Sequence, residues 1–212
     1  MDLKVTKKDK LRGELVIPGD KSISHRSIIL SSLANGRSRV RGFLESQDCL
    51  RTLTAFRNMG VEIEKVSQGE YLINGVGHRG LKEPERVIDC GNSGTSMRLL
   101  TGLLTAQDFY SVLSGDDSLR SRPMGRIIKP LSKMGARIWA RNLEYAPLSI
   151  QGQPLSGIDY QLPIASAQVK SSILLAGLYT DQKVRIVEPA LSRDHTERML
   201  KGFGIELTKE GN

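Results

Sequence analysis

Cationic and hydroxyl side chains gather where the first predicted helix begins. The stretch 13–30, GELVIPGDKSISHRSIIL, reads as an apolar strand at 14–18, a turn, and a helix start. We expect Ser22 and Ser24 to cap that helix. The cations on or beside the helix start are Lys21, His25 and Arg26. Unpaired amides and the positive end of the peptide dipoles favour negative charge at such a place, so the stretch predicts an anion-binding site.

The same residues also allow a plainer interpretation. Lys and Arg near a helix start are often solvated surface, and strand-turn-helix units are common. The stretch lacks the glycines of the GxxxxGK[ST] phosphate loop and of the GxGxxG dinucleotide turn. If this stretch binds an anion, the missing glycines therefore indicate an anion other than a nucleotide.

Turns rich in Ser and Thr recur at the start of two later helices. The three turns are Lys21–Arg26, Asn92–Ser96 and Ser166–Lys170. If the three segments pack around a pseudo-threefold axis, their helix N-termini point to one end of the domain. Each terminus then contributes about 0.3 to 1 kcal/mol to the binding of an anion.

The order of elements around these turns repeats three times and predicts an α/β fold. Each copy reads strand, helix, strand, helix, strand, strand. The first copy is expected to have strands at 14–18, 39–43, 61–64 and 70–74, with Asp48 capping its second helix. The second has strands at 87–90, 110–113, 136–140 and 147–150. The third has strands at 158–162, 184–187 and 205–208.

A marker pair of residues supports the repeat. The second helix of each copy ends at the same kind of pair, and the pairs lie roughly 70 residues apart. They are Met59-Gly60, Met134-Gly135 and Phe203-Gly204. The third copy stops short of its last strand. We therefore expect the chain to be part of a longer one.

Composition favours a small acidic ligand. The 212 residues carry 31 Lys and Arg against 23 Asp and Glu, a formal net charge of +8, but no basic block of five, and only 5% are aromatic. No apolar run is long enough to span a membrane and the N-terminus lacks a signal-peptide core, so the expected location is cytoplasmic. Cys49 and Cys90 have no metal-ligand spacing and are expected to be buried thiols.

Five motifs in order resemble a known enzyme family. Between about Leu11 and Leu207 the chain is similar to the N-terminal half of 5-enolpyruvylshikimate-3-phosphate synthases. The motifs that carry this resemblance are GDKSISHR, GNSGTSMR, SRPM, ASAQVKS and SRDHTERM. The related UDP-N-acetylglucosamine enolpyruvyl transferases have Asn after the first-turn lysine, so Lys21-Ser22 favours the shikimate branch. A non-catalytic domain that binds anions or nucleic acid is the other alternative.

The resemblance implies three βαβαββ repeats about a pseudo-threefold axis, with helices inside and sheets outside. It implies that residues 1–18 form a strand joining a second domain, that residues 19–212 form the shikimate-phosphate-binding domain, and that the C-terminal half, in cis or as a second chain, is the partner. The implied reaction is transfer of enolpyruvyl from phosphoenolpyruvate to the 5-hydroxyl of shikimate 3-phosphate, with release of phosphate. This step belongs to aromatic amino-acid biosynthesis and is the target of glyphosate. It uses no metal or organic cofactor, nucleic acid or membrane.

Residue by residue, the resemblance places Lys21 between the two substrates as the catalytic residue. The implied shikimate 3-phosphate contacts are Lys21, Ser22, Arg26, Ser166, Gln168 and Ser192. The implied phosphoenolpyruvate contacts are Lys21, Asn92, Gly94, Arg122 and Gln168. Ala167 and His195 depart from the family, where many members have Ser and some have Tyr. The proton-moving carboxylates belong to the second domain, so the chain alone is expected to be inactive.

Several other residues have no assigned role in catalysis. Arg98 and Arg126 fit either the site or its scaffold. Arg193 and Asp194 are expected to pair with each other or to cap the helix that starts near His195. Trp139 is expected to pack within its strand and His78 to lie on the surface.

Overall fold

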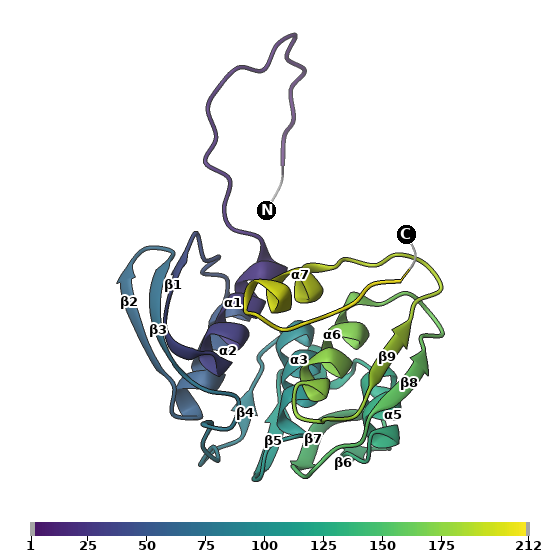
Figure 1. The fold of residues 1–212 in the computed structure, drawn as a ribbon. Helices are drawn as coiled ribbons and strands as arrows, with labels where there is room; N and C mark the ends of the chain where they lie inside the picture. Colours follow the sequence, from purple (N-terminus) through teal and green to yellow (C-terminus); the bar gives the residue numbers. More distant parts are fainter. Residues whose placement is uncertain (1–2, 211–212) are drawn as a thin grey trace.

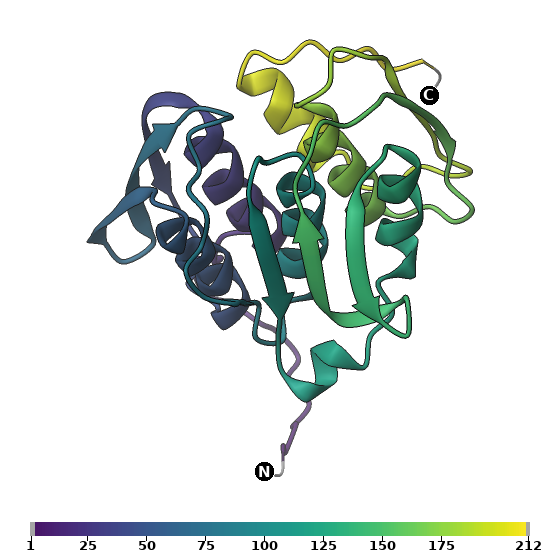
Figure 2. The same ribbon diagram turned by 90° about the horizontal axis from the view of Figure 1, so that it is seen from below.

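Helices lie at the centre of the molecule and small sheets on its outside in the computed structural model, which describes residues 3–210 (Figure 1, Figure 2). The first unit consists of α1 Lys21–Leu33, β1 Asn35–Arg41, α2 Gln47–Asn58, β2 Glu62–Ser67 and β3 Glu70–Val76. The second consists of β4 Ile88–Asp89, α3 Gly94–Leu104, β5 Tyr110–Ser114, α4 Asp117–Arg120, α5 Gly125–Lys133, β6 Arg137–Arg141 and β7 Tyr145–Gln151. The third consists of β8 Ile158–Gln161, α6 Ala167–Gly177, β9 Val184–Val187 and α7 His195–Gly202.

The second unit is the complete copy of the repeat. Its sheet has the order β4-β5-β7-β6, with β4 parallel to β5 and the other neighbours antiparallel. The first unit has only β1-β3-β2, all antiparallel, and the third has only the parallel pair β8-β9. The three βαβαββ repeats are thus confirmed, with strands missing from the first and third. The short helix α4 is an insertion that the sequence pattern did not predict.

Two predicted strands were wrong for this structure. Residues 14–18 and 205–208 have no strand conformation. A strand needs a neighbour to accept and donate its backbone hydrogen bonds, and neither segment is paired with a strand of the three sheets. Instead the segment before α1 extends away from the body of the molecule (Figure 1), where Leu15, Val16 and Ile17 are 85%, 99% and 76% exposed.

The second helix of each unit ends at the predicted glycine. Gly60, Gly135 and Gly204 have φ of 87°, 96° and 85°, the left-handed region that only glycine enters freely. The residue after each glycine donates its N–H to a carbonyl five positions earlier, as in a Schellman cap. This shared ending confirms that the marker pairs occupy equivalent places in the three units.

Close packing of two central helices is set by a glycine. Gly102 of α3 faces Ser172 of α6, and a Cβ at Gly102 would overlap the Ser172 carbonyl oxygen. The apolar residues of α3 are buried on every side: Met97, Leu99, Leu100, Leu103 and Leu104 are all 0% exposed. A helix that is buried all round lies in the core, so the first helices form the centre of the fold.

Other expectations have mixed outcomes. Cys49 and Cys90 are free and buried, as predicted, and His78 is exposed. Trp139 is 57% exposed on β6, so the expectation that it packs was wrong; it lies on the outer face of its sheet. No helix among residues 3–210 is long and apolar enough to cross a membrane. In the same range no group of three His, Cys, Asp or Glu side chains could hold a metal ion.

Candidate functional site

The N-termini of α1, α3 and α6 meet at one end of the molecule, where each is capped by a side-chain oxygen. Ser93 accepts from the Ser96 amide at 3.1 Å and Ser166 from the Val169 amide at 3.4 Å. The cap of α1 is Asp20, which accepts from the Ile23 amide at 2.8 Å. The predicted caps Ser22 and Ser24 lie inside the helix instead, because Asp20 already occupies the extended cap position.

Polar and cationic residues from the first turns of these helices, from the loop after α4 and from the start of α5 form what we call the helix-end cluster. Its members are Lys21, Arg26, Asn92, Gly94, Arg98, Arg122, Arg126 and Gln168. Hydrogen bonds join it across units, since Arg98 donates to the Gln168 Oε1 at 2.7 Å and the Gln168 Nε2 donates to Thr95 at 2.9 Å. The structure thus brings together most of the residues that the sequence predicted to form one site.

Lys21 pairs with Asp48 across the starts of α1 and α2. The Lys21 ammonium donates to the Asp48 carboxylate, and the Lys21 side chain is still 50% exposed. Asp48 does not cap α2 as predicted, because Ser46 holds the cap position and accepts from the Cys49 amide at 3.5 Å. Asp48 lies in the first helical turn, which leaves its carboxylate free to reach Lys21.

Arg26 is buried and joins three helices. Its Nε donates to Thr196 on α7 at 2.6 Å, and its terminal nitrogens donate to the Ser22 carbonyl at 2.9 Å and to Ser171 on α6 at 2.7 Å. Burial, with Arg193 adding to it, lowers the pKa of Arg26 to about 10, so the guanidinium stays charged at neutral pH. Among residues 3–210, no carboxylate lies within the 4.0 Å of an ion pair with Arg26. The carboxylates of Glu197 and Asp20 therefore offset the buried charge of Arg26 only from a longer distance.

His25 is not one of the site's cations, although the sequence placed it among them. It is 0% exposed, and its Nδ1 lies 2.7 Å from the Thr52 hydroxyl. Burial and, next, the nearby Lys21 charge lower the pKa of His25 to about 4. The ring is neutral at pH 7, because burial and the charges of Lys21 and Arg26 together outweigh the stabilising charge of Asp48.

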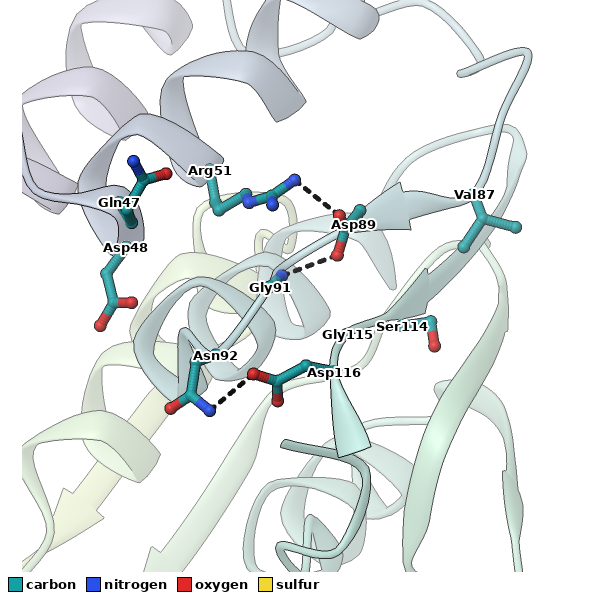
Figure 3. Close-up of a pocket in the computed structure, with 10 residues that line it drawn as sticks. All are labelled: Gln47, Asp48, Arg51, Val87, Asp89, Gly91, Asn92, Ser114, Gly115 and Asp116. Carbon is teal, nitrogen blue, oxygen red and sulfur yellow. Dashed lines mark hydrogen bonds and ion pairs between the residues drawn. The ribbon is translucent and has the colours of Figure 1, made fainter. Parts of the chain in front are cut away.

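Arg122 is fixed by the loop that follows β4. It donates to the Asn92 side-chain oxygen at 2.5 Å, to the Asn92 carbonyl at 3.3 Å and to Ser118 at 3.1 Å. The Asn92 amide nitrogen in turn donates to Asp116 at 2.8 Å (Figure 3). That bond and the Leu119 amide lower the pKa of Asp116, so its carboxylate is ionised. Asp116 was not predicted; its only sequence signal is its place in a turn after β5.

Gly94 lies close to two guanidinium groups. A Cβ there would come within 3.1 Å of an Arg98 nitrogen and 3.6 Å of an Arg122 nitrogen. Burial first, and then the charges of Arg122 and Arg126, lower the pKa of Arg98. Three like charges thus lie near one bare backbone position at a helix start. That arrangement favours an anion held close to Gly94.

Ser192 is connected to the cluster indirectly. Its hydroxyl donates to Glu188, which also accepts from the buried Lys170 at 2.6 Å. Lys170 pairs with Glu197 at 2.6 Å as well. Burial alone would lower the pKa of Lys170, but the hydrogen bonds to the two carboxylates raise it above its ordinary value. This ion triad connects α6, α7 and the loop that carries Ser192.

The loop before α7 also contacts α1. Arg193 donates to the Ser22 hydroxyl at 3.1 Å, and the His195 Nδ1 lies 4.0 Å from an Asp20 oxygen. Asp194 occupies the cap position of α7, as predicted, but makes no side-chain cap hydrogen bond. Arg193, which the sequence assigned to a pairing or capping role, therefore holds the Ser22 hydroxyl by a hydrogen bond.

A hollow of about 510 Å³ lies beside the cluster (Figure 3). Its walls come from the start of α2 and the loops after β4 and β5, namely Gln47, Asp48, Arg51, Val87, Asp89, Gly91, Asn92, Ser114, Gly115 and Asp116. Arg51 donates to Asp89 at 2.6 Å across it. Of the predicted site residues only Asn92 lines this hollow, so the other members of the helix-end cluster lie outside it.

The fold and the site together define an α/β domain in which three helix N-termini converge beside a group of cationic side chains. Residues 5–212 match the family model described as EPSP synthase (3-phosphoshikimate 1-carboxyvinyltransferase). The chain belongs to the EPSP synthase family, as its motifs predicted.

Individual relatives agree with this assignment. Proteins described as 3-phosphoshikimate 1-carboxyvinyltransferase in Magnetococcus marinus and Geobacter sulfurreducens are each 60% identical, over 95% and 93% of this chain respectively. The solved EPSP synthase of Acinetobacter baumannii is 55% identical, with a TM-score of 0.91 over 94% of this chain. The chain spans about half the length of these relatives, 46% of the first two and 45% of the solved structure.

Proposed function

We propose that this chain carries the shikimate 3-phosphate part of an enolpyruvyl transferase active site. The observation that supports this most is the set of arginines in the helix-end cluster, Arg26, Arg98, Arg122 and Arg126. Among residues 3–210 none of the four has a carboxylate within 4.0 Å. Cations held without carboxylate partners at helix N-termini favour a dianionic ligand such as a phosphate ester.

The proposed shikimate 3-phosphate site lies where α1, α6 and the loop before α7 meet. Its hydroxyls come from Ser22, Ser166 and Ser192. Gln168 supplies an amide and Lys21 an ammonium group. Arg26 acts mainly through its charge, because three of its five N–H groups are already used within the protein. Ala167 offers no hydroxyl, so this chain has one donor fewer there than family members with Ser.

The proposed phosphoenolpyruvate site lies around Gly94. Arg122 uses three of its N–H groups on Asn92 and Ser118, which fixes the plane of its guanidinium and leaves the others for the ligand. Arg98 also lies close to Gly94, with one of its nitrogens 3.1 Å from the position of a Cβ there. Asn92 and Gln168 complete the site with amide groups.

Lys21 lies between the two proposed sites, at the exposed edge of α1. In the proposed reaction the 5-hydroxyl oxygen bonds to C2 of phosphoenolpyruvate while C3 takes a proton. The tetrahedral intermediate then loses phosphate and a C3 proton to restore the enol ether. Lys21 stabilises charge on the bridging and phosphate oxygens, and Asp48 holds its ammonium in place.

We further propose that the rest of the family's length supplies the other wall of the cleft and the proton-moving carboxylates. The exposed apolar side chains of residues 15–17 fit a segment that joins that second domain. Closure between two walls orients the substrates, and general acid-base groups contribute about 10² to 10⁴ in rate. A cytoplasmic location stays a prediction.

A reconstitution assay tests this function. The purified 212-residue chain should release no phosphate from phosphoenolpyruvate, with or without shikimate 3-phosphate. Adding the separately produced remainder of the Magnetococcus marinus relative should restore turnover, and Lys21→Ala should abolish it. Lys65→Ala, which removes an exposed lysine paired with Glu45, serves as control and should leave turnover unchanged. Turnover by the chain alone would contradict the proposal.

A further inference from the structure

The loop between β9 and α7 carries a proposed substrate contact, Ser192, but is not held by its own backbone. Within residues 3–210, no backbone N–H or carbonyl of residues 189–193 pairs with another backbone group. Apolar packing does not hold the middle of the loop either, since Leu191 is 70% exposed. The position of Ser192 therefore depends on side-chain contacts.

Glu188 is the side chain that ties this loop to the body of the domain. It is the first residue after β9, and Lys170 on α6 donates to its Oε2 at 2.6 Å. Its Oε1 accepts from the Ser192 hydroxyl. β8 and β9 lie side by side and run in the same direction (Figure 1), so the loops that carry Ser166 and Ser192 leave the same end of that sheet. Glu188 thus connects Ser192 to the helix that begins at the other serine.

The negative charge of Glu188 is offset within the protein. Its partner Lys170 is only 6% exposed and also pairs with Glu197 of α7 at 2.6 Å. A carboxylate beside a phosphate group repels it, and a cation paired with that carboxylate reduces the repulsion. The pair with Lys170 therefore allows an acceptor for the Ser192 hydroxyl to lie close to an anion-binding site.

The Ser192 hydroxyl has a single proton, and Glu188 accepts it in the free chain. The phosphate group of a dianionic ester has only acceptor oxygens, so a hydrogen bond from Ser192 to that group uses the same proton. Rotation about the Cβ–Oγ bond is enough for this exchange when the oxygen is already in place. A loop without that anchor would first have to be ordered, which costs conformational entropy.

We infer that Glu188 is a positioning residue for shikimate 3-phosphate, which holds the Ser192 hydroxyl in place until the ligand accepts its proton. This inference rests on the function proposed above. Glu188 is not one of the proposed ligand contacts and acts through Ser192. Glu197 shares Lys170 with it but has no such role, because α7 is anchored independently by Leu200, which is 1% exposed. Loss of Glu188 and loss of Glu197 therefore have different consequences for the ligand.

Calorimetric titration of variants of the 212-residue chain with shikimate 3-phosphate tests this inference. Glu188→Ala should lower the affinity about tenfold, because the hydrogen bond of Ser192 to a charged ligand is misplaced. Glu188→Gln keeps an acceptor oxygen on a side chain of the same length and should stay within about twofold of the wild type. Glu197→Ala is the matched control, since it also removes a carboxylate from Lys170, and it should stay within about twofold as well.

A double-mutant cycle determines whether Glu188 acts through Ser192. Ser192→Ala alone should weaken binding of shikimate 3-phosphate about tenfold, and adding Glu188→Ala should cause no further loss. Two independent contacts would instead give about a hundredfold loss. Thermal unfolding of every variant sets a titration temperature at which all are folded. Where Glu188→Ala does not fold, Glu188→Asp replaces it with the same expected loss, because it keeps a carboxylate for Lys170 but withdraws it from Ser192 by one methylene group.

Relaxation measurements by NMR give a second result that needs no ligand. The backbone order parameters of residues 189–193 should fall below about 0.6 in Glu188→Ala and stay at the wild-type values in Glu197→Ala. A loop that stays ordered in Glu188→Ala, equal losses of affinity in the two alanine variants, or additive losses in the cycle would overturn the inference. No binding of shikimate 3-phosphate by the wild-type chain would instead overturn the proposed function, and the inference with it.

Discussion

Asp116 accepts a hydrogen bond from the Asn92 side-chain nitrogen at 2.8 Å, and this bond turns the Asn92 oxygen toward Arg122. Without it the Asn92 amide could rotate and present a second donor to the guanidinium. Asp116 touches none of the proposed ligand positions directly, so we regard it as a positioning residue for Arg122.

Asp116→Ser should weaken phosphoenolpyruvate binding in the reconstituted enzyme about tenfold, because a lost hydrogen bond to a charged group costs about 1.5 to 3 kcal/mol. Serine keeps the cap of α4 but is too short to reach Asn92. Asp117→Ser is the matched control, since Asp117 is 95% exposed and pairs only with Arg120. Competition binding of phosphoenolpyruvate in the presence of shikimate 3-phosphate measures the effect. Equal loss in both variants would exclude a positioning role.

Gly94→Ala should separate stability from binding. Gly94 is the first residue of α3, its φ is not positive, and Ala is a better helix former by about 0.5 to 1 kcal/mol. The new methyl group should push the Arg98 guanidinium away and reduce affinity for phosphoenolpyruvate about tenfold or more. Thermal unfolding and calorimetry on the same sample check both effects. A variant that binds as well as the wild type would show that no ligand approaches this position closely.

The free energy of unfolding should decrease as the pH is lowered from about 6.5 to 4, because of His25. Its pKa is about 4 in the folded chain against 6.5 in the unfolded chain. Below pH 6.5 the unfolded state takes up the proton first, so the free energy of unfolding decreases by up to roughly 3 kcal/mol and levels off near pH 4. Above pH 6.5 the ring is neutral in both states and contributes no pH dependence.

Urea unfolding at pH 7.5, 5.5 and 4.5 measures this dependence. The carboxylates Glu45 and Glu70 titrate lower, with pKa values of about 2 in the folded chain and 4.5 unfolded, so most of their effect lies below this window. His25→Gln should flatten the profile, whereas His78→Gln, on the exposed surface, should not change it. An unchanged profile in His25→Gln would assign the pH dependence to another group.

Lys170→Met should destabilise the chain by about 3 to 5 kcal/mol, because it leaves the two carboxylates Glu188 and Glu197 without their buried cation. Lys183→Met, at an exposed position, should cost less than about 0.5 kcal/mol. Denaturant unfolding of both variants provides the comparison. A small effect at Lys170 would mean that water or another cation compensates the carboxylates.

The repeat could be predicted from the sequence because its signals are local. A glycine that ends a helix, a Ser before a helix, and alternating apolar residues each depend on a few neighbouring positions, as at Gly60 and Ser166. The strands at 14–18 and 205–208 were predicted by the same signals. They are absent because a strand also requires a partner, and pairing is not a local property.

The helix-end cluster was predicted mainly by resemblance, and the structure supplied its internal contacts. The pair Lys21–Asp48 joins residues 27 positions apart, and Arg26–Thr196 joins residues 170 apart, so neither has a sequence signature. His25 looked like a cation because its neighbours are cations. Its burial against Thr52 depends on the packing of α1 on α2, which the sequence does not state.

Calorimetric titration of the 212-residue chain with shikimate 3-phosphate tests most directly whether the helix-end cluster binds that substrate. Weak saturable binding is expected, because one wall of the cleft is missing and each tenfold loss of affinity corresponds to about 1.4 kcal/mol. Binding should be lost in Lys21→Ala, retained in Lys65→Ala, and absent with UDP-N-acetylglucosamine. Equal binding of both ligands, or shikimate 3-phosphate binding that survives Lys21→Ala unchanged, would contradict the account.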